Sequence, residues 1–367
     1  MLLTQFPRIS ALVPRVSPPA RYRNAASFAL LSVLFGCSFV AIKTGLRELP
    51  PLLFAGLRFD IGAAVLIGYV VGTRARSTWL PQTRNDVLGI ATAGVFLVAL
   101  NNALLFTGQG STTPAMASIM YGLNPVLAPV FAWWLLGDRL RKVRALGIGI
   151  ALAGVVIIVQ PSPSTLGGDG TVGQLLVLGA AAAIAAGSVL LKRLQPQMDR
   201  LPLTAWAMAV GALLLHGSSL AGGEAQASVG TAGPLTLASL LVVGVPSTAV
   251  AYALHFGLLE RIGPVRANLV AYVVPITAAL TGWVFLAAGL SWVTVVGFLV
   301  VVAGFGLVER RTLRREVCRL RRRHDRRRGA NPTPDGGQRW PCDDGVARHG
   351  GGQLPPAGRG TAPPGAE

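Results

Sequence analysis

Three ionisable side chains, Lys43, Arg58 and Asp60, lie within or at the end of long apolar stretches. In stretches that cross a bilayer, such groups are costly and face the protein interior or a water-filled cavity. Arg58 either binds an anionic group of a ligand or ties helices together. Asp60 either carries a proton, because burial favours its neutral form, or forms an ion pair with Lys43 or, through a neighbour, with Arg58. Helical residues two apart point to different faces, so Arg58 and Asp60 do not pair directly.

A second set of polar side chains combines amides and aromatic rings in the same kind of stretch. Such a lining suits a pocket for a modestly polar or cationic organic molecule. The alternative for each residue is core packing or a hydrogen bond between helices, and His216 is expected to be peripheral. The cavity candidates are Asn101, Asn102, Tyr121, Asn124, Tyr252, His255, Asn268 and Tyr272.

The residue pattern of an enzyme or an ATPase is missing from the sequence. The four histidines, at positions 216, 255, 324 and 349, are scattered, and the serines at positions 188, 218 and 219 lack a supporting His/Asp pattern at helical spacing. A phosphate-cradling loop of the P-loop type is also lacking. The sequence therefore predicts no enzymatic activity, no cofactor, no metal site and no ATP-driven transport.

The elements that must position these side chains are long apolar helices. Only 13% of the 367 residues are charged and 52% are hydrophobic, whereas about a quarter of an ordinary soluble domain is charged. A span of about 20 apolar residues crosses the roughly 30 Å of hydrocarbon. We therefore predict an all-α integral membrane protein with ten transmembrane helices, near 25–43, 51–72, 87–108, 114–136, 143–160, 172–191, 203–221, 235–258, 264–287 and 290–308.

The positive charges predict how the chain lies in the cell membrane. Basic loops face the cytoplasm as a rule, and alternate loops carry nearly all the Lys and Arg, while the others hold only Lys43 and Arg47. Both termini are therefore expected in the cytoplasm. Much of the net charge of +18 comes from 11 arginines in residues 310–328. A basic cluster beside a membrane attracts anionic lipid headgroups, and we favour that partner over nucleic acid.

The sequence also contains a repeat. With a shift of 150 residues, about 40 positions align without a gap, including Pro125 with Pro275, Gly147 with Gly297 and Gly154 with Gly304. Further upstream a shift of 149 places Lys43 on Lys192. Five spans per repeat is an odd number, so the second copy enters the membrane upside down. Inverted repeats of this kind are an architecture of secondary transporters, with the substrate near the midplane between halves.

The repeat defines the expected domains. These are a basic cytoplasmic segment (1–24), a first five-helix repeat (25–160), an external linker (161–171), a second repeat (172–308) and a basic, then disordered cytoplasmic tail (309–367). Pro125 and Pro275 are expected to interrupt the fourth span of each repeat near midmembrane. Each break is either a hinge for rocking halves or a packing kink without a role in mechanism.

The motifs "FGCSFVAIK" (35–43), "PPLLFAGLRF" (50–59) and "PAMASIMYGLNPVLAPVFAWWLLGDRL" (114–140) resemble those of drug/metabolite transporters with two EamA-type repeats. "GIGIALAGVVII" (147–158) follows, and 274–308 echoes it. Two departures are Asp138 and Ala288, where that family usually carries glutamate. The resemblance implies a secondary active transporter that moves a small organic metabolite or drug by alternating access, by efflux, with proton coupling as an option.

A membrane scaffold or sensor that recruits partners through the basic tail is the alternative function. The substrate, the direction of transport, the coupling ion and the oligomeric state stay open at this point.

Overall fold

The computed structural model describes residues 20–160, 168–262, 267, 269–289, 291–310 and 314. Residues 310–367 form a separate unit, of which only 310 and 314 are described. The described part of the chain is helical and contains no strand. Eight of its helical spans are long and apolar enough to cross a membrane, and two further apolar helices have 17 residues each. The prediction of ten spans in an all-α fold is therefore confirmed.

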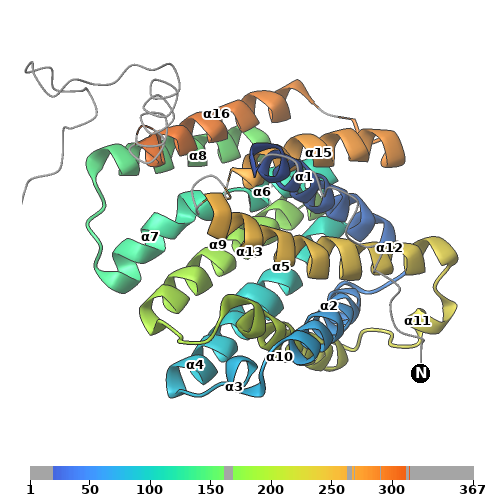
Figure 1. The fold of residues 1–367 in the computed structure, drawn as a ribbon. Helices are drawn as coiled ribbons and strands as arrows, with labels where there is room; N and C mark the ends of the chain where they lie inside the picture. The colour runs from blue at the N-terminus through green and yellow to red at the C-terminus, as the bar shows by residue number, and fades with distance from the viewer. Residues whose placement is uncertain are drawn as a thin grey trace, which may run out of the picture. The chain divides into compact units, whose positions relative to one another are not determined.

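The first five spans are α1 (Ala20–Gly45), α2 (Pro51–Thr73), the continuous run α4 (Arg84–Thr92), η2 (Ala93–Leu100) and α5 (Asn101–Gly110), the broken pair α6 (Pro114–Tyr121) and α7 (Asn124–Leu136), and α8 (Lys142–Val159). The second five are α9 (Asp169–Leu194), α10 (Arg200–Ala221), the run α12 (Pro234–Gly244), η3 (Val245–Val250) and α13 (Ala251–Ile262), α15 (Val270–Leu286) and α16 (Trp292–Val308). Two short helices, α3 (Arg76–Trp79) and α11 (Ser228–Thr231), lie in loops (Figure 1).

Local sequence signals set the helix ends. Proline occupies the first turn of α2, α6 and α12, where its missing N–H costs nothing. Thr83 and Asp86 form a capping box at the start of α4, and Gly137 ends α7 with a φ of 68°, a backbone conformation that glycine adopts without strain. These signals place the loops, and therefore the two ends of the bundle.

Two buried or half-buried carboxylates fasten loops to helix ends. Asp86 is 1% exposed. One carboxylate oxygen forms the capping box with Thr83, and the other, Oδ1, accepts hydrogen bonds from the backbone N–H groups of Gln197 and Met198 at 2.8 and 2.9 Å. Glu224 in the same way accepts from the N–H groups of Leu52 and Leu53 at the start of α2. Carboxylates at helix N-termini are stabilised by the free N–H groups there, so these acids hold the frame together.

The packing of α8 against α16 displays the relation between the repeats (Figure 1). Gly147 packs on Gly304, and Gly154 packs on Gly297, so closely that a Cβ on any of the four would lie within 3 Å of an atom of the partner helix. Since Gly147 corresponds to Gly297 and Gly154 to Gly304, each contact is the image of the other. A two-fold axis between the helices produces this reciprocal pattern.

A second reciprocal pair lies on the other side of the bundle. Gly62 of α2 packs on Thr248 of η3, and Gly211 of α10 packs on Val98 of η2. Under the shifts of 149 and 150 residues, Gly62 corresponds to Gly211 and Val98 to Thr248. The two halves of the membrane domain therefore have inverted topology, as the odd number of spans predicts.

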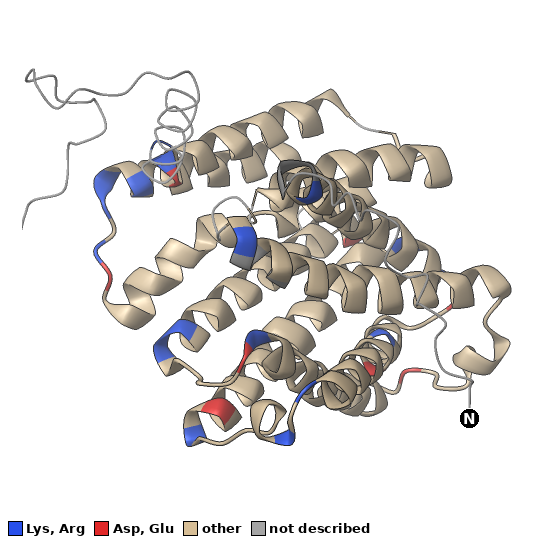
Figure 2. Cartoon of the chain, viewed as in Figure 1, with Lys and Arg blue, Asp and Glu red and all other residues tan. Residues whose placement is uncertain are grey.

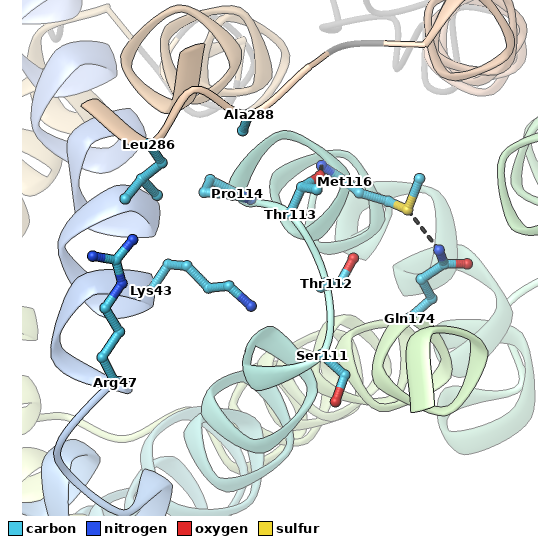
Figure 3. Close-up of a pocket in the computed structure, with 10 residues that line it drawn as sticks. All are labelled: Lys43, Arg47, Ser111, Thr112, Thr113, Pro114, Met116, Gln174, Leu286 and Ala288. Atoms are coloured by element: carbon cyan, nitrogen blue, oxygen red, sulfur yellow. Dashed lines mark hydrogen bonds between the residues drawn. The ribbon is translucent and has the colours of Figure 1, made fainter. Parts of the chain in front are cut away.

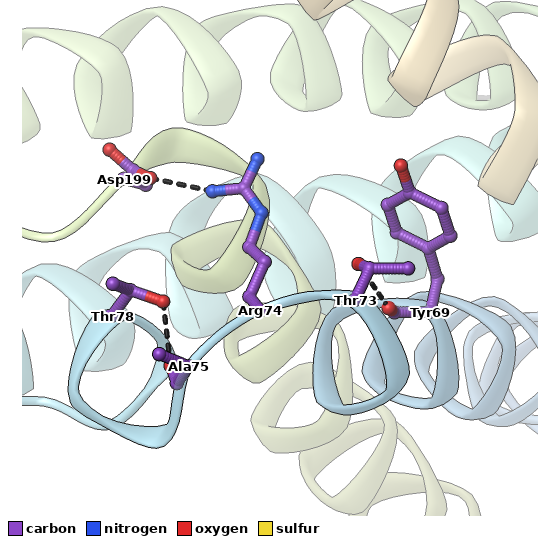
Figure 4. A network of polar contacts seen from close by, with 6 residues as sticks. All are labelled: Tyr69, Thr73, Arg74, Ala75, Thr78 and Asp199. Atoms are coloured by element: carbon purple, nitrogen blue, oxygen red, sulfur yellow. Dashed lines mark hydrogen bonds and ion pairs between the residues drawn. The ribbon is translucent and has the colours of Figure 1, made fainter.

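The charged residues separate the two ends of the bundle. The end formed by loops 74–83, 137–141 and 195–199, which we call the basic end, carries most of the described Lys and Arg residues. Figure 2 shows most of the basic segments toward one side of the bundle, at the left and below. At this end Arg74 forms an ion pair with Asp199, 2.6 Å long, which joins α2 to the loop before α10 (Figure 4). At the opposite end, the described Lys and Arg residues are Lys43 and Arg47.

Candidate functional site

Arg58 is the centre of a polar cluster inside the bundle. Its side chain projects from α2 and is only 7% exposed. Its Nε donates to Thr248 Oγ1 at 2.8 Å and a terminal nitrogen donates to Asn102 Oδ1 at 3.4 Å. The guanidinium also lies 4.8 Å from the ring centre of Phe59 and 5.7 Å from that of Phe106, in the range of a cation–π contact. Among the described residues, no carboxylate lies within ion-pair distance of it.

The two hydrogen-bond acceptors of Arg58 come from the third span of each repeat. Thr248 lies in the π-helical segment η3, and Asn102 lies in the first turn of α5, two residues after the π-helical segment η2 ends at Leu100. A π-helical turn inserts an extra residue and frequently marks a functional site. The Thr248 hydroxyl donates to Val243 O, five residues back, and Asn102 Nδ2 donates to Val98 O. The widened turns therefore fix both side chains toward Arg58.

Sequence reasoning missed Thr248 and both π-helical segments. The only signal in the sequence is a polar residue two positions after Pro246 in an otherwise apolar span. Arg58 and Thr248 are 190 residues apart, so their pairing follows only from the fold.

Three more cavity candidates join this cluster. Asn101 is 2% exposed and donates to the Tyr121 hydroxyl at 3.3 Å. Tyr121 packs edge-on against Phe39, and Tyr252 packs edge-on against Phe35. Both phenylalanines belong to α1. Both tyrosines are close enough to Arg58 to interact with it electrostatically. The structure therefore brings together Arg58, Asn101, Asn102, Tyr121 and Tyr252 at the junction of the repeats.

Other candidates have different surroundings. Tyr272 stacks on Phe305 of α16 with ring centres 4.0 Å apart, and its buried hydroxyl has no hydrogen-bond partner among the described residues. Asn124 donates its side-chain N–H to the carbonyl of Tyr121 at 3.3 Å. His255 is half-buried on α13. Asn268 lies outside the described residues.

The two prolines behave differently. The fourth span breaks at residues 122–123, and Pro125 occupies the first turn of α7. Because proline has no N–H, the carbonyl of Tyr121, four residues before Pro125, lacks its helical hydrogen-bond donor. The side-chain amide of Asn124 donates to this carbonyl instead. Pro275 instead lies inside α15, which is continuous from Val270 to Leu286. The prediction that Pro275 interrupts the fourth span of the second repeat is therefore wrong.

The expectation for Asp60 needs correction. The Asp60 side chain is 52% exposed, so it is not buried within the protein. Its partner is neither Lys43 nor Arg58 but His216 of α10, with Nε2 and Oδ2 2.7 Å apart. The contact lies in an exposed part of the bundle, with 28% of the His216 side chain exposed. The pair forms because α2 and α10 pack closely at Gly56, whose missing side chain leaves room for the imidazole.

Lys43 lies at the end of the bundle opposite the basic end, and it caps a helix. Its ammonium donates to the carbonyls of Gln109 and Gly110 at 3.0 and 2.6 Å, where a helix C-terminus carries partial negative charge. Beside it is a pocket of about 390 Å³, which we call the vestibule. It is lined from α1 and the following loop, the α5–α6 loop, α6, α9 and the end of α15 (Figure 3).

The described part of the chain thus contains ten apolar spans in two inverted repeats, with a buried polar cluster where the repeats meet. This combination defines a polytopic membrane protein of the transporter type. The model of the EamA-like transporter family matches residues 24–160 and 171–310. The chain belongs to this family.

Relatives in other organisms are also named as transporters. An uncharacterized transporter of Archaeoglobus fulgidus is 29% identical over 284 residues, which cover 77% of this chain and 97% of the relative. The uncharacterized inner membrane transporter YedA of Escherichia coli K12 is 28% identical over 258 residues, 70% of this chain and 80% of YedA.

A third relative has a more specific name. It is a "Probable amino-acid metabolite efflux pump" of Salmonella typhimurium, 28% identical over 299 residues, 78% of this chain and 96% of the pump. One solved crystal structure shares the fold, with a TM-score of 0.55 and 22% identity, and the match covers 79% of this chain and 98% of that one.

Proposed function

We propose that this protein is a secondary active transporter that moves a small organic metabolite across the cell membrane by alternating access between its inverted repeats. The observation that carries the proposal is Arg58, a buried cation whose acceptors, Asn102 and Thr248, come from the third span of each of the two repeats. Groups held by both halves at their junction are where a midplane substrate site belongs. A relative rocking of the halves would change these contacts.

The substrate class follows from the same cluster and from one relative. Amide, phenol and guanidinium groups surrounded by aromatic rings suit a small molecule with polar and apolar parts. The named Salmonella relative makes amino-acid metabolites the first compounds to test. By the positive-inside rule, the basic end faces the cytoplasm together with both termini, and the direction we propose is efflux. The arginine-rich segment after the last span then lies beside the inner lipid headgroups.

Proton coupling through Asp60 is part of the proposal. Asp60 and His216 are both ionisable, and their 2.7 Å contact joins α2 of the first repeat to α10 of the second. A proton exchanged at this pair would change the attraction between the two helices. A packing role for the pair predicts no effect on proton movement.

Transport and coupling can be separated in inside-out vesicles that carry a pH gradient. Amino acids, amino-acid derivatives and purines are added one at a time while a fluorescent probe reports the internal pH. We expect one class to dissipate the gradient with the native protein and not with Asp60→Asn. Asp138→Asn, a change of an exposed carboxylate at the basic end, is the matched control and should act like the native protein.

Two other outcomes bear on the proposal. Movement of a labelled compound without proton movement removes the coupling and leaves transport intact. If no compound in the panel crosses the membrane in either direction, the transporter proposal is wrong.

A further inference from the structure

The vestibule has the chemistry of an anion site. It is lined by two cationic residues, Lys43 and Arg47, and by no acidic residue in the described part of the chain. The neighbouring carboxylate, Glu48, is engaged elsewhere, because it accepts a hydrogen bond from Gly233 N at 2.7 Å. Two cations without a countercharge repel each other, and Arg47 lies close enough to Lys43 to do so. A bound anion relieves that repulsion.

Hydrogen-bond donors are available on the cationic side. The ammonium of Lys43 has three N–H groups, and two of them donate to Gln109 O and Gly110 O. The guanidinium of Arg47 makes no hydrogen bond or ion pair with another described residue. Figure 3 shows Lys43 and Arg47 extending from the α1 side, with Lys43 directed toward Ser111 and Thr112 on the facing wall.

The facing wall has polar atoms that lack partners. Thr112 is 7% exposed, and its Oγ1 is buried without a hydrogen-bond partner among the described residues. Gln174 Oε1 is also buried without one, and its Nε2 meets only the sulfur of Met116, which is a weak acceptor. A buried polar group without a partner is costly, so these atoms indicate a ligand rather than a finished wall.

We propose that the vestibule binds a small organic carboxylate, as the substrate site at this end of the transport path. The carboxylate accepts from the free N–H of Lys43, from Arg47 and from the Thr112 hydroxyl. Apolar side chains of Pro114, Met116 and Leu286 contact the rest of the molecule, and the volume of about 390 Å³ admits a ligand of amino-acid or aromatic-acid size. Its role in transport rests on the proposed function, but its binding does not.

Binding of radiolabelled benzoate to the purified full-length chain in lipid nanodiscs tests the site directly. Benzamide, which has the same shape without the charge, is the matched competitor. We expect saturable benzoate binding that other carboxylates displace, and that benzamide and inorganic phosphate displace poorly. Equal displacement by phosphate or by benzamide would overturn the assignment to carboxylates, and an absence of benzoate binding would overturn the site.

Two matched pairs of variants locate the site. Ala288→Glu places a carboxylate in the vestibule wall, whereas Ala288→Gln adds the same volume without charge. Arg47→Gln removes a donor and a charge, whereas Arg47→Lys keeps the charge. A charge-assisted hydrogen bond lost from a ligand weakens binding by roughly 10-fold or more. We expect that loss for Ala288→Glu and Arg47→Gln only.

Equal affinity in Ala288→Glu and Ala288→Gln would contradict the proposal, because both variants change the shape of the wall alike. Transport is measured separately in proteoliposomes made from the same preparations. Benzoate binding that follows the charge of residue 288 without any transport would retain this site and remove the transporter proposal. Transport of a compound without charge-dependent binding in the vestibule would retain the transporter proposal and remove this site.

Discussion

Gly304 is the position where one added methyl group tests the packing of the two repeats most severely. A Cβ at Gly304 would lie 2.5 Å from the backbone nitrogen of Ala151 and 2.6 Å from the carbonyl oxygen of Gly147. Both are backbone atoms of α8, so α8 and α16 must separate by about 0.9 Å to restore an ordinary contact of 3.4 Å. Overpacking of this kind costs about 1–3 kcal/mol, and a gap of that size along the helix also weakens the dispersion contacts.

Gly306, two residues further along α16, is the matched control because a Cβ there meets no atom within 4 Å. Alanine in a helix is favoured over glycine by about 0.5–1 kcal/mol. We therefore expect Gly304→Ala to lower the free energy of unfolding by about 2 kcal/mol, and Gly306→Ala to leave it unchanged or raise it. Unfolding in mixed micelles of rising SDS fraction measures both.

The repeat extends this test. Gly154 is the equivalent of Gly304, and a Cβ there would lie 2.8 Å from Gly297 O, so Gly154→Ala should be destabilising in the same way. If Gly304→Ala and Gly306→Ala unfold at the same SDS fraction, α8 and α16 do not pack as described and the reciprocal contact has no support.

Three other predictions concern the site and the loops. Thr248→Val removes an acceptor from the buried guanidinium and should cost about 2 kcal/mol of unfolding free energy, whereas Thr248→Ser should not; equal stability would contradict the network. Pro125→Ala should slow transport in proteoliposomes more than Pro275→Ala, because the helix is broken only at the former; the reverse order would contradict the hinge. In the loop after α1, hydrogen bonds from the Gly233 N–H and, to a smaller extent, from the Thr236 hydroxyl hold the pKa of Glu48 below its usual 4.5. This contact stabilises the folded state above the unfolded pKa and is lost as the pH falls through the lower folded pKa. Protection of the Gly233 amide from hydrogen exchange should therefore fall in that range, and in Glu48→Ala, which removes the acceptor, it should be low throughout; protection that does not change with pH would contradict the contact.

The helices and their inverted repeat could be predicted from sequence because both depend on local or periodic signals. Apolar length defines a membrane span, and a 150-residue shift aligns Gly147 and Gly154 with Gly297 and Gly304. The break before Pro125 was also predictable, because proline cannot continue a helix from within. The same rule failed at Pro275, where tertiary packing tolerates the proline inside a continuous helix.

The candidate site could be predicted only in part. Arg58, Asn101 and Asn102 stand out as polar residues in apolar spans, and the structure brings them together. Their partners come from distant segments, as the 190 residues between Arg58 and Thr248 illustrate. The partner of Asp60 was missed for the same reason, because a single histidine in an apolar span shows no periodic signal.

The vestibule illustrates a further limit. Its walls come from four separate segments, and its polar atoms differ from ordinary polar residues only in lacking partners. Thr112 and Gln174 are unremarkable in sequence. Unsatisfied burial is a property of the assembled fold, so no local pattern could have marked them.

The central claim is that two inverted repeats alternate access to a site between them, and the distance between spin labels at each end tests it most directly. With the native cysteines replaced, one pair of labels spans the vestibule at Gly110 and Gly289, where a side chain meets no atom within 4 Å, and a second pair spans the basic end at Gln195 and Leu140. Addition of a transported compound should shorten one distance distribution and lengthen the other. Two distributions that stay fixed, or that change in the same direction, would contradict alternating access.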